Sequence, residues 1–516
     1  MQNLIVQFRA PRKTNLLNVN PSSHLPLGFL VFRVKKFLVQ FIYFLILSLL
    51  GYLALKVSKP RSISGGEASL FRPKDLDLFF TSVSAATVSS MSSVEMEVFS
   101  NTQLVILASL MLLGGEVVTS MLGLQLQFIR SKVQELGTLG HNNPNPNLEE
   151  DHAKPNTTSS LEPSRINSIK FLANVVLCYL LVVHVVGSTS IFIYMSLVPR
   201  AREVLKDKGI PIQIFSIFTV ISSFGNCGFI PTNENMIVFI RNSGLLLLVV
   251  PPILLGNTLY APCLRLVVSV LERFTKREEF NYILKNFRHL GYEHLLSSVQ
   301  SLWVGVTVFG FILVQLILFC SLEWNSEGFG GLNSYQKLVG SLFQVVNSRH
   351  AGESVVDISV ISPAILVVFI FMMYLLPYTC YFPTNDDEDA SGSRNDKESN
   401  KPRKTLVHYR LFSRLSVLVI FIVLICITER EKLKEDPLNF NVLNISLEVF
   451  SAYGNVGLTT GYSCKRRLNS QGYCKDAWYG FAGRWSNKGK LVLILVMFFG
   501  RLKNFFRKGG KACKLS

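Results

Sequence analysis

Four segments rich in small and polar residues recur along the chain, and each lies between two apolar runs. They read FTSVSAATVSSMSSVEME, FTVISSFGNCGFIPTNENM, LFQVVNSRHAGESVVDIS and LEVFSAYGNVGLTTGYSC, and they align without gaps. One column of that alignment holds Ser90, Gly228, Gly352 and Gly457. Glycine adopts positive-φ backbone conformations at little steric cost, which lets backbone carbonyls turn toward a common axis. A ring of such carbonyls can replace the hydration shell of a cation, so the column predicts a transient cation site made of backbone oxygens.

The residues before this column indicate how the site would be positioned. About ten residues in each segment, such as 80–89 and 218–227, are compatible with a helix too short to cross a bilayer. Non-helical backbone at membrane depth persists only where protein encloses it or where it lines a water-filled cavity. A short helix that ends in such a cavity directs its partially negative carbonyl end inward, which favours a cation. The alternative, in which the glycines only allow close helix packing, explains single glycines better than an aligned column.

The composition indicates that a bilayer surrounds these segments. Hydrophobic residues make up 49% of the 516 residues and charged residues only 17%, against roughly a quarter in average soluble domains. Runs of about twenty apolar residues, long enough to cross about 30 Å of hydrocarbon, lie near 37–57, 103–129, 169–197, 236–264, 299–322, 359–382 and 411–427, with a weaker run near 488–506. The sequence therefore predicts an all-α integral membrane protein. It would contain four consecutive membrane-pore-membrane units, with eight transmembrane helices and four re-entrant pore loops around one pore.

Polar stretches separate the predicted units. Segments 131–166 and 384–404 are polar and lack an apolar period, so we expect disordered cytoplasmic linkers there. The predicted division is a cytoplasmic N-terminal segment at 1–36, pore unit A at 37–130, a linker at 131–166, pore unit B at 167–272, a cytoplasmic loop at 273–298, pore unit C at 299–383, a linker at 384–404, pore unit D at 405–506 and a cytoplasmic tail at 507–516.

The formal charge of +18 is explained by membrane topology, without a nucleic-acid partner. Basic residues cluster before the first apolar run, after the fourth and after the last, and the positive-inside rule then places both termini in the cytoplasm. One loop disagrees with this rule, because four basic residues fall on the side assigned to the exterior. They are Arg200, Arg202, Lys206 and Lys208.

Several polar residues near the column have two interpretations each. Some acidic and amide residues after the column could line an outer vestibule that concentrates cations, or could be solvated loop residues. They are Glu95, Glu97, Asn233, Glu234 and Glu353. Asn226 and Asn455, two residues before their glycines, are expected to hold the loops by hydrogen bonds. Cys464 and Cys474 lie ten residues apart in a polar segment assigned to the exterior, where a disulfide and two free thiols remain equally open.

No motif indicates an enzyme. The chain lacks paired Cys-x-x-Cys motifs, His-Glu-x-x-His, a phosphate-binding loop and a Gly-x-Gly-x-x-Gly after a strand. We therefore expect no catalytic residues and no cofactor, and transport that runs down an electrochemical gradient.

Several long motifs resemble one family. The segments SSFGNCGFIPTNENM, VVNSRHAGES, SAYGNVGLTTGYSC and GFAGRWSNKG are similar to the plant HKT transporters of the Trk/Ktr/HKT cation transporter superfamily, and the resemblance runs from about residue 37 to 506. It implies one selectivity filter formed by Ser90, Gly228, Gly352 and Gly457. A serine at the first position resembles the sodium-selective type, and a glycine the potassium-permeable type. Some serine-bearing members are nevertheless grouped with sodium and potassium symporters.

The resemblance also concerns the region below the filter. In relatives a basic residue of the last inner helix faces the pore as an electrostatic barrier, which would be Arg501 here. The alternative is that Arg501, like Lys503, extends to the cytoplasmic interface. Relatives gate at an interrupted inner helix of the third unit, and here that helix carries Pro363 but no glycine run.

The leading expectation is a plasma-membrane transporter that carries Na⁺ passively, as a uniporter or channel-like protein. The first alternative is a Na⁺ and K⁺ symporter on the same scaffold, and the second is a polytopic receptor or membrane enzyme. The expected partners are Na⁺ or K⁺ and the lipid bilayer, and the sequence leaves a homodimer open.

Overall fold

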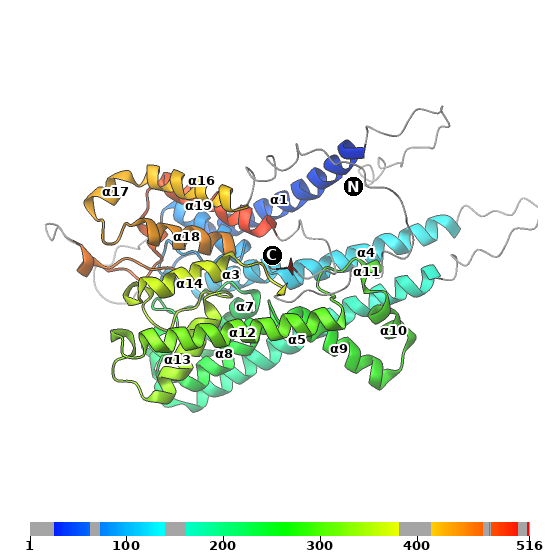
Figure 1. The fold of residues 1–516 in the computed structure, drawn as a ribbon, viewed down its shortest axis with the longest axis horizontal. Helices are drawn as coiled ribbons and strands as arrows, with labels where there is room; N and C mark the ends of the chain where they lie inside the picture. Colours follow the sequence, from blue (N-terminus) through cyan, green and yellow to red (C-terminus); the bar gives the residue numbers. More distant parts are fainter. Residues whose placement is uncertain are drawn as a thin grey trace, which may run out of the picture.

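The computed structural model of the chain describes residues 25–61, 73–139, 161–380, 414–467, 474, 476–503 and 513–514. The described chain is almost entirely helical, and the long helices run roughly along the long axis of the molecule (Figure 1). This confirms the predicted all-α class. The predicted linker at 384–404 lies outside the described residues.

The first helix of each predicted unit lies on the outside of the molecule. These helices are α1 (Leu25–Val57), α5 (Leu161–Leu197), α12 (Ser298–Glu323) and α16 (Arg414–Thr428). Three of them, α1, α5 and α12, contain stretches long and apolar enough to cross a membrane, with mean hydropathy of 2.2 to 2.4. Their outward faces carry uncovered apolar side chains, such as Leu302 of α12 at 66% exposure. Exposed apolar side chains on helices of this length are typical of a surface that faces lipid.

A second set of helices is too short to span a bilayer. They are α2 (Asp75–Ala86), α7 (Ile212–Gly225), α13 (Ser334–Asn347) and α18 (Val442–Gly454). These helices contain 12 to 14 residues, which at 1.5 Å per residue is about 20 Å against the 30 Å of the hydrocarbon core. Each one ends shortly before a position of the Ser-Gly-Gly-Gly column. They are the short helices that the four aligned segments predicted, and we call them the pore helices.

The inner helices follow the pore helices, and those of the first two units are bent pairs, which the apolar runs did not indicate. They are α3 (Asn101–Gly114) with α4 (Glu116–Leu139), α8 (Ser243–Leu255) with α9 (Tyr260–Thr275), α14 (Pro363–Tyr374) and α19 (Asn487–Leu502). The first pair is bent by 57° and the second by 80°. Pro251 and Pro252 lie inside α8 and donate no backbone hydrogen bond there. Pro377 disfavours a helical conformation at the preceding residue, so α14 ends far short of the predicted run to 382.

Glycines hold three of these inner helices against the pore helices. A Cβ at Gly114 would overlap the backbone carbonyl of Ala86, and one at Gly500 would overlap that of Tyr453. A Cβ at Gly256 would likewise overlap the carbonyl of Phe224. Ala86, Phe224 and Tyr453 each stand four residues before a column position. These glycines were not predicted to have a role, although each lies within an apolar run.

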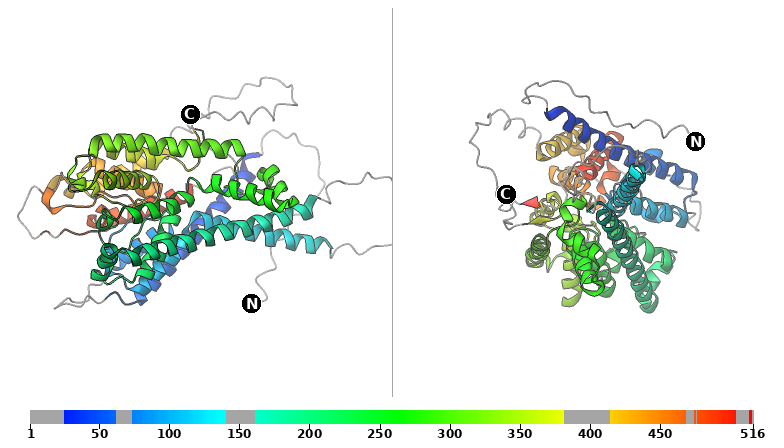
Figure 2. Two further views of the ribbon diagram at one scale, coloured as in Figure 1. Left: turned by 90° about the horizontal axis from the view of Figure 1, so that it is seen from below. Right: turned by 90° about the vertical axis from the view of Figure 1, so that its right-hand side faces the viewer.

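The four units close into a ring. Helix α3 packs against α7, α8 against α13, α14 against α18, and α19 against α2, so each unit contacts the next and the fourth contacts the first. Seen end-on, the units succeed one another around the molecule (Figure 2). The two largest hydrophobic clusters lie between units B and C and between units A and D. The exact number of spans and the unit boundaries remain predictions.

The remaining elements connect these helices. They are α6 (Pro199–Asp207), α10 (Glu278–Lys285), α11 (Phe287–Leu290), α17 (Arg430–Glu435) and the parallel pair β1 (Thr379–Cys380) and β2 (Cys513–Lys514). Helices α4 and α5 extend into both ends of the segment 131–166, so those ends are helical and not part of a disordered linker. Residues 140–160 of that segment lie outside the described chain.

Candidate ion-conduction site

The four column residues all have a positive φ. Ser90 has φ of 51°, Gly228 of 83°, Gly352 of 69° and Gly457 of 88°. A positive φ is readily adopted by glycine but is uncommon for other residues. The glycines therefore satisfy a conformational demand at these turns, and Ser90 meets the same demand despite its Cβ.

The same residues lie next to one another in chain order. A Cβ at Gly228 would overlap the carbonyl of Ala351, and a Cβ at Gly352 would overlap the backbone of Val456 and Gly457. A Cβ at Gly457 would overlap the Cβ of Ser90, whose Oγ would in turn lie 3.4 Å from a Cβ at Gly228. The four turns thus form a closed ring, which we call the ring.

A cavity of about 130 Å³ lies against one side of the ring. All four ring residues line it, together with Asn233 and Glu234 from the segment after Gly228. We call it the outer cavity, because its lining lies on the side predicted to be the exterior.

A smaller cavity of about 40 Å³ lies on the other side, which we call the inner cavity. Residues two or three positions before a ring residue line it, namely Val88, Gly225, Asn226, Gly454 and Asn455. Four charged side chains also line it, and they are Glu116, Arg349, Arg501 and Lys503. The ring therefore separates two cavities along one path.

Asn226 and Asn455 hold the turns by hydrogen bonds. Both residues end a pore helix in the left-handed conformation, which asparagine tolerates better than most residues. The Nδ2 of Asn226 donates to Phe224 O at 3.1 Å and Ile253 O at 3.4 Å. The Nδ2 of Asn455 donates to Ser89 Oγ at 2.7 Å and Met497 O at 3.3 Å. Asn455 thereby ties the fourth unit to the residue before Ser90.

Arg501 and Lys503 do not extend to an interface. Arg501 is 3% exposed, its Nη2 donates to Gly114 O, and its guanidinium lies 5.4 Å from the centre of the Phe44 ring. Lys503 is 8% exposed, and its Nζ donates to Tyr453 O at 2.5 Å. The interpretation in which these side chains snorkel is therefore wrong, and both line the inner cavity.

The residues predicted to line an outer vestibule lie in different surroundings. Asn233 and Glu234 line the outer cavity, and Glu97 forms an ion pair beside it. Glu95 accepts a hydrogen bond from the backbone of Trp478 at 3.1 Å. Glu353 was assigned wrongly, because its side chain is fully buried and accepts a hydrogen bond from Ser223 Oγ at 2.6 Å.

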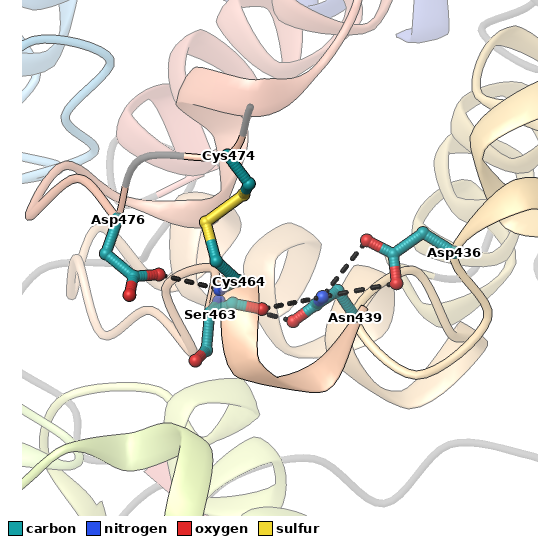
Figure 3. The surroundings of a disulfide bond; sticks show 6 residues. All are labelled: Asp436, Asn439, Ser463, Cys464, Cys474 and Asp476. Carbon is teal, nitrogen blue, oxygen red and sulfur yellow. Dashed lines mark hydrogen bonds between the residues drawn. A yellow bond between two sulfur atoms is a disulfide. The ribbon is translucent and has the colours of Figure 1, made fainter. Parts of the chain in front are cut away.

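Cys464 and Cys474 form a disulfide, the outcome that the sequence left open (Figure 3). Their Cα atoms are 5.9 Å apart. The backbone N of Cys464 donates to Asp476 Oδ1 at 2.6 Å, and Asn439 joins Asp436 to the backbone of Ser463. These bonds fix the loop that closes one side of the outer cavity.

Among the described residues, no group of three or more His, Cys, Asp and Glu side chains could hold a metal ion.

Comparisons with known proteins give the family. The profile of TrkH, described as a cation transport protein, matches residues 63–379 and 393–506. The chain is 52% identical to sodium transporter HKT1 of Arabidopsis thaliana, over 89% of this chain and 91% of that protein. It is 49% identical to cation transporter HKT1;3 of Oryza sativa subsp. japonica, over 94% and 92%.

The chain also has some similarity to a solved structure. The potassium transporter TrkH from Vibrio parahaemolyticus is 14% identical to this chain, with a TM-score of 0.48 over 91% of this chain and 83% of that one. The profile match and the two plant relatives cover most of the chain. The chain therefore belongs to the plant HKT family of the Trk/Ktr/HKT superfamily, and it is a multi-pass membrane cation transporter and not an enzyme.

Proposed function

We propose that this protein carries Na⁺ selectively and passively across the plasma membrane, with both termini in the cytoplasm. Ser90, Gly228, Gly352 and Gly457 form the selectivity filter, and the cation binds transiently to backbone carbonyls. The observation that carries this proposal is the closed ring with a cavity on each side. The pore helices support it, because a helix that ends at the ring directs its partial negative charge there.

Sodium selectivity rests on Ser90. The space between the first and fourth turns is already filled by the Ser90 side chain, since a Cβ at Gly457 would overlap it. A ring crowded on one side yields less readily to a large dehydrated cation than a ring of four glycines. Potassium should therefore lose more coordination energy than sodium, which can pass with part of its water. The name of the Arabidopsis relative, a sodium transporter, supports the same assignment.

The test is to express the chain in oocytes and measure reversal potentials as external Na⁺ and K⁺ are exchanged. The reversal potential of the wild type should follow the external Na⁺ concentration and should not respond to K⁺. Ser90→Gly should raise the K⁺ to Na⁺ permeability ratio about tenfold, which corresponds to about 1.4 kcal/mol of selectivity. Ser93→Gly makes the same chemical change three residues further on, outside the ring, and should leave selectivity unchanged.

Other outcomes would support other functions. A wild-type reversal potential that follows both ions would favour a Na⁺ and K⁺ symporter. Absence of any cation current from protein shown to reach the surface would contradict the proposal altogether. Equal effects of Ser90→Gly and Ser93→Gly would contradict the special role of Ser90.

A further inference from the structure

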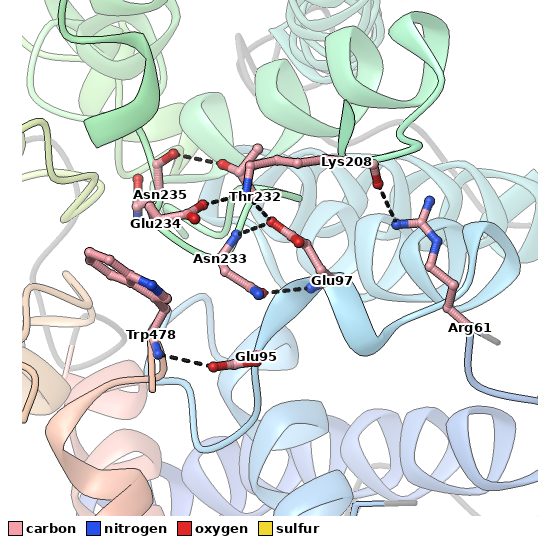
Figure 4. Close-up of polar contacts among 9 residues, drawn as sticks. All are labelled: Arg61, Glu95, Glu97, Lys208, Thr232, Asn233, Glu234, Asn235 and Trp478. Carbon is pink, nitrogen blue, oxygen red and sulfur yellow. Dashed lines mark hydrogen bonds and ion pairs between the residues drawn. The ribbon is translucent and has the colours of Figure 1, made fainter. Parts of the chain in front are cut away.

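One lysine of the predicted exterior loop faces the molecule and pairs with two carboxylates. The Nζ of Lys208 lies 2.6 Å from Glu97 Oε1 and 2.5 Å from Glu234 Oε2 (Figure 4). Its side chain is 17% exposed, and those of Glu97 and Glu234 are 24% and 23% exposed. Lys206, two residues earlier on α6, is exposed to solvent. Lys208 therefore differs from its neighbour in position and not in chemistry.

The backbone around Lys208 is held in place from another unit. Arg61, which follows α1, donates from Nη1 to Lys208 O at 3.2 Å and from Nη2 to Gly209 O at 2.6 Å. Burial alone would lower the pKa of the Lys208 ammonium, but hydrogen bonds and charges from Glu234 and Glu97 outweigh it, so the pKa lies above its ordinary value. The ammonium thus stays charged throughout the physiological pH range.

The two carboxylates lie at the entrance to the outer cavity. We call this entrance, made of Glu97, Asn233, Glu234 and Lys208, the outer mouth. Glu234 lines the outer cavity in the segment that follows the ring residue Gly228. Glu97 is joined to that segment twice, because its Oε1 accepts from Asn233 N at 3.0 Å and its backbone N donates to Asn233 Oδ1 at 2.9 Å (Figure 4). The ammonium therefore neutralises charge at the point where a cation would approach the ring.

We propose that Lys208 sets the affinity of the outer mouth for external cations, as a tethered counter-ion of Glu97 and Glu234. This inference rests on the proposed function, in which cations approach the ring through the outer cavity. With the ammonium in place, the three side chains carry a net charge of −1 in place of −2. An incoming cation then meets a weaker local field, and it competes with an ammonium that is already bound.

Two variants distinguish this electrostatic role from a structural one. Lys208→Met leaves two unneutralised carboxylates and a net charge of −2. The triple variant Lys208→Met, Glu97→Gln, Glu234→Gln removes the ion pairs as well but leaves no charge. If the ion pairs only held the mouth together, both variants would change transport in the same direction.

The measurement is the external Na⁺ concentration that gives half-maximal current, at low and at physiological ionic strength. Lys208→Met should lower it by about tenfold at low ionic strength, which is the lower end of the effect of focused charge. The triple variant should raise it above the wild-type value. Both shifts should shrink near physiological ionic strength, where the Debye length is about 8 Å. Lys208→Arg should behave as the wild type, and Lys206→Met, with the same loss of charge, should do the same.

Each result has one meaning. Shifts of opposite sign in Lys208→Met and the triple variant, with Lys206→Met unchanged, support the inference. Shifts of the same sign, or none, overturn it while leaving the proposed function intact if wild-type Na⁺ current is present. A wild type that reaches the surface without Na⁺ current contradicts the proposed function instead. Surface labelling of every variant separates loss of protein from loss of affinity.

Discussion

The outer mouth and the inner cavity lie on opposite sides of one ring and carry opposite charges. At the mouth, Glu97 and Glu234 outnumber the single ammonium of Lys208. The inner cavity is lined by three cationic side chains and only one carboxylate, that of Glu116. On the proposed path, a cation is thus attracted before the ring and opposed after it. This contrast suggests that the two directions of flow are not equivalent.

The three inner cations also share a structural task. Arg349 Nη2 donates to Leu376 O at 2.8 Å, Arg501 Nη2 to Gly114 O, and Lys503 Nζ to Tyr453 O at 2.5 Å. Gly114 is the last residue of α3, Leu376 follows the end of α14, and Tyr453 lies in the last turn of α18. Carbonyls at helix ends lack partners within the helix and carry partial negative charge. The cationic side chains are therefore held in the inner cavity by carbonyls at helix ends. At the mouth the reverse holds, because two carboxylates hold one lysine.

The largest expected effect is to break the ring that separates the two regions. Gly457→Ala adds a Cβ that overlaps Ser90, at φ of 88°, and should abolish transport. Gly461→Ala is a matched control, because Gly461 has φ of 64° and nothing lies within 4 Å of its added Cβ. That control should lose only about 1–2 kcal/mol through its left-handed backbone. Currents and surface expression of both variants check this, and retained selective current in Gly457→Ala would show that the ring is not the barrier.

An intermediate effect should follow from removing one inner cation. Arg501→Gln should increase current and reduce rectification. A unit charge about 10 Å away raises the energy of a cation by about 1.7 kcal/mol at an effective dielectric constant of 20. Current–voltage curves measure this. Arg501→Lys keeps the charge and should retain the wild-type curve, and Lys488→Gln, at an exposed position of the same helix, should have no effect. An unchanged current–voltage curve in Arg501→Gln would mean that the positive charge of the inner cavity does not affect conduction.

The smallest effect on conduction should come from the outer loop that carries the disulfide. Cys464→Ser with Cys474→Ser should lower the stability of the folded protein by about 2–3 kcal/mol, as expected for a short closed loop. Reversal potentials should not change, since neither cysteine lines a cavity next to the ring. Thermal unfolding in detergent and reversal potentials measure the two outcomes. Altered selectivity in this double variant would mean that the loop shapes the ring.

Sequence predicted well what local pattern determines. The ring could be predicted because each of its turns requires a positive φ after a short helix. Glycine meets this requirement in three of the four turns, so the pattern is visible in the sequence. The disulfide was left open and the breaks in the inner helices were not predicted from the apolar runs, because each depends on residues that are neighbours only in the folded chain. Gly256, for example, is required by the carbonyl of Phe224, a contact that no periodicity shows.

Charged residues were the least predictable. Glu353 directly follows a ring glycine, yet its side chain turns back toward Ser223, because the turn after Gly352 directs it into the protein. In the sequence, Lys208 is one of the four basic residues that disagree with the positive-inside rule. Its partners Glu97 and Glu234 stand 111 and 26 positions away, so only the packed units bring them together.

The closure of the ring by a single chain has a genetic consequence. In a channel assembled from four identical subunits, one codon specifies the same ring position four times, and any substitution is repeated around the axis. Here each quarter of the ring has its own codon, since Ser90, Gly228, Gly352 and Gly457 come from successive units. A single base change can therefore alter one quarter and leave three intact. If the ring is the filter, as proposed, its ion preference can be adjusted in small steps during evolution, without passing through a ring that is changed on all sides at once.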